Sequence, residues 1–258
     1  MPIVSVLMTS YNRENYICES IESVLSSSFS DFELIIVDDC SLDNTFEIAS
    51  DYAQRDPRIK VFRNTVNLGD YPNRNIAASY AQGKYLKYLD SDDIIYPHGL
   101  RVMVDAMEQF PDAGFGLASI SDFSDPFPIM LSSHDTYLEH FGKYGHFGRA
   151  PGSSIIQTKA FKFVNGFSGK RMIGDFELWF TLSRYYPMVK FPRDLVWDRV
   201  HEGQESQSDY AQNYNRLRKS VIRDALEHPD CPLNKDEIIS ALNSNKMEVL
   251  KKIIKRWI

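Results

Sequence analysis

The chain has 258 residues, of which 43% are hydrophobic, which is ample for one large domain with a substantial core. Its formal net charge is −6 and no basic patch dominates its first 240 residues, so we expect no binding to nucleic acid. There is no secretory leader pattern and no apolar window of about 18 residues, so a soluble, cytoplasmic protein is expected.

The first half of the chain alternates strand-like and helix-like patterns. Strands are expected at 3–8, 35–37, 59–62 and 85–89, and helices at 14–25, 44–55 and 75–81. This β-α-β-α-β-α-β order predicts a parallel sheet with right-handed crossovers. After Pro97 the pattern is less regular. Further helices are expected at 100–110, 176–185 and 210–227, and short strands at 115–120 and 153–157.

Carboxylates cluster where two of these strands end. Asp38 and Asp39 follow the strand at 35–37, and the segment Asp90-Ser91-Asp92-Asp93 follows the strand at 85–89. One interpretation is an acidic turn, because Asp and Ser are common turn residues. The other is a ligand site, since carboxylates this close repel one another unless a cation compensates them. Because two strands end in acidic residues, the pattern favours a ligand-binding crevice at the carboxyl ends of the strands.

Several segments together resemble the family-2 glycosyltransferases, which have the GT-A fold and move a sugar from a nucleotide sugar to an acceptor. The resemblance covers most of residues 2–208. It rests on the segments 4–12, 36–45, 67–69 with Arg74-Asn75, 83–93, 174–179 and 199–201. It implies an α/β, Rossmann-like, mostly parallel central sheet flanked by helices, with a helical C-terminal extension.

The resemblance also implies a division of the chain and a reaction. Residues 1–98 would form the nucleotide-sugar-binding half of the GT-A domain, 99–208 its acceptor-binding and catalytic half, and 209–258 the extension. The expected enzyme is a metal-dependent, inverting glycosyltransferase acting in surface polysaccharide or glycolipid assembly. Its donor would be a nucleoside-diphosphate sugar, with a UDP-sugar favoured, and its acceptor a saccharide or lipid-linked saccharide.

Two other functions stay open. A nucleotidyltransferase would usually carry a Gly-rich basic loop after the first strand, and the segment 9–13 is not one. A nucleotide-sugar-binding protein without turnover is the second alternative, because Gly174 stands where the family usually has an acid.

The donor site is assigned by resemblance. Its residues would be Thr9, Tyr11, Asp39, Arg74, Asp90, Ser91 and Asp92. Asp92 and His201 would bind Mn²⁺ or Mg²⁺, since carboxylate and imidazole suit such ions. Asp93 either joins this site or braces its turn. The remaining histidines lack such a context and are expected at the surface; they are His98, His134, His140, His146 and His228.

The resemblance makes Asp175 the catalytic base, which takes the proton of the acceptor hydroxyl. The alternative is an N-cap of the helix at 176–185. Cys40 stands where the family often has glycine, so a positive φ there would require a reshaped loop.

Two further segments are interpreted from composition. Residues 202–208 are polar and follow His201, and we expect a lid that orders over the donor. Residues 246–258 form a basic amphipathic pattern. This pattern suits docking at the inner face of an anionic membrane, or packing on the domain or on a second subunit in a homodimer.

Overall fold

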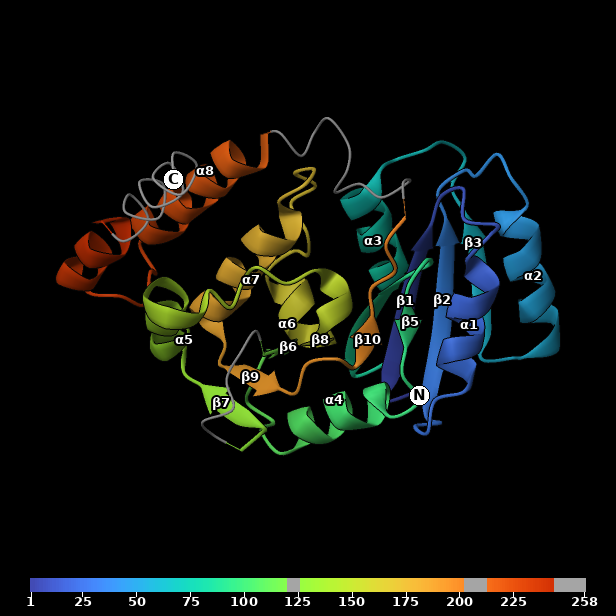
Figure 1. Cartoon of the computed structure of the whole chain (residues 1–258), viewed down its shortest axis with the longest axis horizontal. Helices are drawn as coiled ribbons and strands as arrows, with labels where there is room; N and C mark the ends of the chain where they lie inside the picture. Colours follow the sequence, from blue (N-terminus) through green and yellow to red (C-terminus); the bar gives the residue numbers. More distant parts are fainter. Residues whose placement is uncertain (120–125, 202–212, 244–258) are drawn as a thin grey trace, which may run out of the picture.

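The computed structural model describes residues 1–119, 126–201 and 213–243. Its centre is an eight-stranded sheet with the order β3-β2-β1-β4-β8-β6-β9-β7, and β10 and β5 form a second, two-stranded sheet (Figure 1). The strands are β1 Val4–Ser10, β2 Phe32–Asp38, β3 Ile59–Arg63, β4 Tyr85–Asp90, β5 Ile94–Ile95, β6 Phe115–Ala118, β7 Ile129–Leu131, β8 Ser154–Gln157, β9 Met188–Phe191 and β10 Val196–Trp197.

Helices cover the sheet and extend beyond it. They are α1 Ile17–Leu25, α2 Thr45–Arg55, α3 Asp70–Ser79, α4 Gly99–Glu108, α5 Ser133–Glu139, a π-helical turn His140–Tyr144, a 3₁₀ turn Pro151–Ser153, α6 Thr158–Phe163, α7 Gly174–Tyr185 and α8 Tyr214–Glu227. Residues 235–243 are also helical. The helices after β9 form the helical extension, which packs on α7 through α8.

The sheet has a separate apolar core on each face. Alternate residues of a strand point to opposite faces, so Val6 of β1 joins the core under α1, α2 and α4, whereas Leu7 joins the core under α3, α6 and α7. Burial on both faces explains the near-continuous apolar runs of β1 and β2. Apolar packing on both faces therefore holds the central sheet in place, including the edge where its parallel strands end.

The first four strands are parallel neighbours, as the β-α-β order predicts. In the register of β1, Ser10 lies opposite Asp38 of β2, and Thr9 lies opposite Asp90 of β4. Parallel strands end at one edge, so the acidic segments after β2 and β4 meet there. From β4 onward the sheet is mixed, because β8 pairs antiparallel with both β4 and β6.

One predicted helix boundary is wrong in a way that affects the site. Helix α3 begins at Asp70, directly after Gly69, and not at Asn75. The sequence pattern misled because Pro72 suggests a break, yet a proline is tolerated in the first turn of a helix, where its missing N–H has no intrahelical partner. Arg74 therefore lies within α3 and not at its start, and it is buried.

Cys18, Cys40 and Cys231 are free thiols. Within the described ranges, no helix is long and apolar enough to cross a membrane. The expected lid at 202–208 and the basic amphipathic segment at 246–258 lie outside the described residues.

Candidate active site

The end of β4 carries two of the residues predicted to bind the donor. The Ser91 hydroxyl donates to the main-chain oxygen of Thr9 over 2.9 Å, which ties the β4 turn to the end of β1. Asp90 accepts a hydrogen bond from Arg74 Nη2 at 2.6 Å. The structure thus brings Thr9, Arg74, Asp90 and Ser91 to one place.

The two residues predicted to bind metal meet at the same edge. His201 Nε2 lies 3.0 Å from Asp92 Oδ2, although 109 residues separate them in the chain. Arg13, which the sequence analysis missed, donates from Nε to the same carboxylate oxygen at 2.8 Å. The His201 ring packs on Tyr16 with centroids 4.7 Å apart. Asp92 therefore stands between an imidazole and a guanidinium.

Asp93 braces the segment that carries His201. Its carboxylate accepts the main-chain N–H of Arg199 at 3.0 Å, and Arg199 Nε donates to the main-chain oxygen of Asp92 at 2.8 Å. Burial, followed by the charge of Asp90, raises the pKa of Asp93 to about 8. Asp198, also missed from the sequence, adds to this repulsion. Of the two roles left open for Asp93, these contacts favour the brace.

Arg74 is a nearly buried cation at this edge. Its side chain is 6% exposed and forms ion pairs of 2.6 Å with both Asp70 and Asp90. The guanidinium also lies 5.7 Å from the ring centroid of Tyr88. Its Nη1 atom has no hydrogen-bond partner among the described residues. A buried N–H group without a partner is costly, so Nη1 is suited to a ligand oxygen.

Asp39 organises a loop. Its carboxylate accepts the main-chain N–H groups of Leu68 and Gly69, the latter at 2.8 Å, and an N–H of the Asn64 side chain at 2.8 Å. These bonds hold the turn that begins α3. Tyr11, the aromatic residue predicted to line the same pocket, is 41% exposed and has room to contact a planar ligand.

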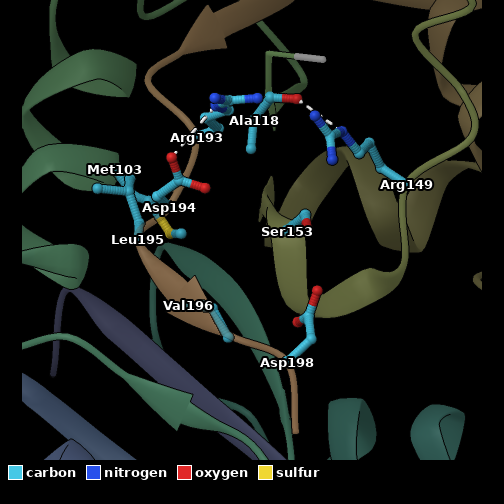
Figure 2. A pocket seen from close by; sticks show the side chains of 9 residues that line it. All are labelled: Met103, Ala118, Arg149, Ser153, Arg193, Asp194, Leu195, Val196 and Asp198. Atoms are coloured by element: carbon cyan, nitrogen blue, oxygen red, sulfur yellow. Dashed lines mark hydrogen bonds and ion pairs between the residues drawn. The ribbon is translucent and has the colours of Figure 1, made fainter. Parts of the chain in front are cut away.

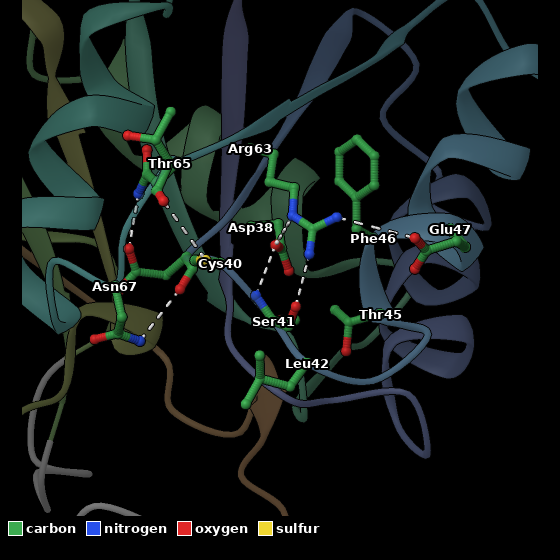
Figure 3. A network of polar contacts seen from close by, with 12 residues as sticks. Asp38, Cys40, Ser41, Leu42, Thr45, Phe46, Glu47, Arg63, Thr65 and Asn67 are labelled. Atoms are coloured by element: carbon green, nitrogen blue, oxygen red, sulfur yellow. Dashed lines mark hydrogen bonds and ion pairs between the residues drawn. The ribbon is translucent and has the colours of Figure 1, made fainter.

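The turn after β2 is held by Asp38 and Arg63 (Figure 3). Asp38 is fully buried, lies 3.4 Å from Arg63 Nε and accepts the N–H of Ser41 at 2.9 Å. Arg63 Nη2 also donates to the Ser41 carbonyl at 2.7 Å. Between them, Cys40 adopts the positive φ of 64° that glycine would favour. The position does take a positive φ, and Cys40 itself adopts this left-handed conformation.

Asp175 lies in the first turn of α7, directly after Gly174, which lies against Tyr71 of α3. Its Oδ1 atom accepts the N–H of the adjacent Phe176 at 2.7 Å. Although Asp175 keeps part of its surface exposed, burial of the carboxyl group raises its pKa to about 6. The hydrogen bond from the Phe176 N–H and the charge of Arg74 oppose that rise. A carboxylate titrating near neutral pH is suited to accept a proton.

A pocket of about 190 Å³ opens beside this edge, and Figure 2 shows its lining. Asp198 reaches it from the segment after β10, and burial together with the charge of Asp90 raises the pKa of Asp198. Arg149 also lines the pocket and donates to the main-chain oxygens of Ala118 and Ser119. The pocket thus offers both a carboxylate and a guanidinium. Trp179 is fully buried and does not line the pocket.

Two of the site residues that the sequence did not predict adjoin segments that it did single out, Arg13 closely and Asp198 less clearly. Arg13 directly follows the polar turn after the first strand, and Asp198 directly precedes the segment 199–201. Tyr71 had no such signal, since its position was assigned to the residues before a helix.

The mostly parallel sheet flanked by helices, with acidic residues gathered where its strands end, has the architecture of the GT-A glycosyltransferases. The family model of glycosyl transferase family 2 matches residues 5–166, and the chain belongs to this family. The protein is therefore a glycosyltransferase.

Similar proteins extend this assignment. The chain is 27% identical over 247 residues to an uncharacterized glycosyltransferase of Haemophilus influenzae, an alignment covering 88% of this chain and 74% of that protein. It is 39% identical over 105 residues to the Escherichia coli UDP-Glc:alpha-D-GlcNAc-diphosphoundecaprenol beta-1,3-glucosyltransferase WfgD, covering 41% of each protein.

Solved structures share the fold. S. aureus TarS 1–349 in complex with UDP-GlcNAc superposes with a TM-score of 0.74 at 20% identity, over 95% of this chain and 72% of that one. The Pyrobaculum calidifontis mannosyltransferase PcManGT, in complex with GDP-Man and Mn²⁺, superposes with a TM-score of 0.65 at 15% identity, over 98% and 75%. These likenesses establish the GT-A fold.

Proposed function

We propose that this glycosyltransferase uses a divalent metal to move a sugar from a nucleoside-diphosphate sugar to a hydroxyl group of a saccharide or lipid-linked saccharide, with inversion at the anomeric carbon. The observation that carries the proposal is the meeting of Asp92 and His201 at 3.0 Å beside the buried Arg74. An acid, an imidazole and a guanidinium at one strand end suit a metal diphosphate.

The donor set fits Mn²⁺ or Mg²⁺. In the described parts of the chain, no three His, Cys, Asp or Glu side chains converge as ligands. Ions of this kind are commonly held by one or two protein groups together with phosphate oxygens and water, so Asp92 and His201 suffice. Such an ion would offset the charge that develops on the departing diphosphate. Arg74 Nη1 would add a hydrogen bond to a phosphate oxygen.

Asp175 would accept the proton of the acceptor hydroxyl as the new bond forms. The hydroxyl oxygen attacks the anomeric carbon, the bond to the diphosphate breaks, and no sugar–enzyme bond forms. Direct attack from the face opposite the leaving group inverts the anomeric centre. The pocket lined by Arg149 and Asp198 has groups that can hydrogen-bond sugar hydroxyls.

A UDP-sugar donor is favoured by the name of WfgD and by the UDP-GlcNAc bound to TarS. The WfgD acceptor is a diphosphoundecaprenol-linked sugar, which supports a lipid-linked acceptor and a place in surface polysaccharide or glycolipid assembly. We assign 1–98 to donor binding, 99–208 to acceptor binding and catalysis, and 209–258 to the extension. An enzyme with such an acceptor would work in the cytoplasm at the inner face of the membrane.

The decisive experiment measures thermal stability with UDP, GDP, CDP or dTDP, each with and without Mn²⁺. A nucleotide at about 100 times its Kd stabilises a protein by about 2.7 kcal/mol. We expect one nucleotide, UDP, to raise Tm, and to raise it further when Mn²⁺ is present. If none of the four raises Tm in either condition, the donor site is misassigned.

A second measurement separates turnover from binding. Asp175→Asn should keep the UDP-dependent shift in Tm and abolish transfer, because the amide cannot take the proton. Retained transfer would exclude Asp175 as the base. The absence of transfer by the wild-type protein with the stabilising nucleotide's sugars would support a binding protein without turnover.

A further inference from the structure

The segment that carries His201 has little regular structure of its own. It leaves β10, a strand of two residues that pairs with β5, and residues 198–201 are neither helix nor strand. The side chain of Val200 is 82% exposed, so apolar packing of this residue does not hold the segment. Contacts of the neighbouring Arg199 hold it instead.

Arg199 joins this segment to two other parts of the chain. Its Nε donates to the main-chain oxygen of Asp92 at 2.8 Å, and its own main-chain N–H donates to the Asp93 carboxylate at 3.0 Å. Both contacts reach the turn after β4. Its Nη2 forms an ion pair of 2.5 Å with Glu19, which lies in the first turn of α1. The Arg199 side chain is only 17% exposed.

Aromatic rings complete the surroundings of Arg199. The central guanidinium carbon lies 5.1 Å from the ring centroid of Tyr16 and 4.9 Å from that of Trp197, which is within the range of cation–π attraction. The Tyr16 ring also packs on the His201 imidazole, with centroids 4.7 Å apart. One tyrosine thus contacts both Arg199 and His201. A flat guanidinium with bonds in fixed directions suits such a place better than a lysine ammonium does.

We propose that Arg199 is the positioning residue of the metal site: its side chain fixes the segment to α1 and to the turn after β4, and so holds the His201 imidazole beside the Asp92 carboxylate. This inference rests on the proposed role of Asp92 and His201 as metal ligands. Arg199 Nε and Nη2 are bonded to protein oxygens, which separates this role from the phosphate contact proposed for Arg74.

The test compares Arg199→Lys, which keeps the positive charge, with Arg199→Met, which removes it. The first readout is the NMR signal of the His201 imidazole in protein without metal, assigned with His201→Ala. The Tyr16 ring displaces this signal in the wild type, and both variants should move it toward that of an exposed histidine. The second readout is the affinity of the UDP-bound protein for Mn²⁺, from the electron paramagnetic resonance of free Mn²⁺. Groups that orient metal ligands typically change metal affinity about tenfold to a hundredfold, and a loss of this size is expected in both variants.

Arg58→Met is the matched control. Arg58 also pairs with a carboxylate, that of Asp56 at 2.7 Å, and lies 4.6 Å from the ring centroid of Phe32. Phe32 begins β2, so this arginine lies at the opposite end of the strands from the proposed metal site. Both readouts should match the wild type. Glu19→Gln should weaken Mn²⁺ binding by less than about threefold, because Glu19 is 59% exposed and exposed ion pairs contribute little.

The outcomes separate this inference from the proposed function. A wild-type His201 signal and wild-type Mn²⁺ affinity in Arg199→Met would overturn the positioning role. The same result in Arg199→Lys alone would also overturn it, because charge without the planar group would then suffice. Unchanged Mn²⁺ affinity in His201→Ala would instead overturn the proposed metal site, while the His201 signal in protein without metal would still show whether Arg199 holds the imidazole.

Discussion

Replacement of Arg74 by methionine tests the electrostatic design of the donor edge. Arg74→Met keeps an unbranched side chain in α3 but removes the cation that pairs with Asp70 and Asp90 at 2.6 Å each. Both carboxylates then lose their compensating charge. The free energy of unfolding should fall, and the buried nitrogen proposed to meet a phosphate oxygen should be lost.

The size of the effect follows from opposing contributions. Removing one partner of a buried ion pair costs about 3 to 5 kcal/mol. Asp70 and Asp90 are 40% and 31% exposed, so water can solvate them and the cost lies at the low end. Removing the unpartnered Nη1 atom stabilises the folded state by about 1 to 3 kcal/mol, because a buried donor without a partner is lost. We expect a net loss of about 2 kcal/mol, or about 4 to 8 °C in Tm for a chain of this size.

The assay is urea unfolding followed by circular dichroism, together with UDP titration in Mn²⁺. Arg58→Met is the control, because Arg58 also pairs with a carboxylate, that of Asp56, at 2.7 Å but is 36% exposed. Its loss should cost less than about 1 kcal/mol. UDP affinity should fall about tenfold to a hundredfold in Arg74→Met alone. An unchanged urea midpoint and slope would refute the reasoning on charge, and unchanged UDP affinity would refute the phosphate contact.

Three other outcomes are expected. Transfer should rise with pH through about 6, because Asp175 must be deprotonated to act and burial raises its pKa to about 6; a profile that is flat from pH 5 to 8 would contradict this. His201→Ala should weaken the Mn²⁺-dependent part of UDP binding in calorimetry and leave the Mn²⁺-independent part unchanged, whereas equal loss in both would exclude metal binding. Burial lowers the pKa of Lys87 to about 7 from an unfolded value of 10.5, so the chain takes up a proton when it unfolds between these pH values. The free energy of unfolding of the wild type should therefore rise with pH in this range, by up to about 1.4 kcal/mol per pH unit from this group. Lys87→Met should lack that gain in urea melts from pH 7 to 9, and parallel curves for both proteins would contradict the assignment.

The sequence by itself determined the order of β1 to β4 and the helices between them, and it placed carboxylates after β2 and β4. These features are local, because strand and helix periods and strand-end residues are written in short windows of the chain. The parallel arrangement then follows from the β-α-β order, and it brings the segments after β1, β2 and β4 to one edge. The family and the GT-A fold were predictable for the same reason.

Only the tertiary structure decided what those residues touch. The main-chain N–H of Arg199, two residues before His201, donates to Asp93, which lies 106 residues earlier in the chain. Tyr71 of α3 lies against Gly174 of α7. His140 and His146, expected at the surface, are 6% and 4% exposed because packing between α5 and α7 encloses them. Such contacts depend on how distant elements pack, and no short window of sequence encodes them. For this protein, the order of strands and helices along the chain determines which segments meet at the edge of the sheet. Long-range packing determines the charge and orientation of the side chains at that edge.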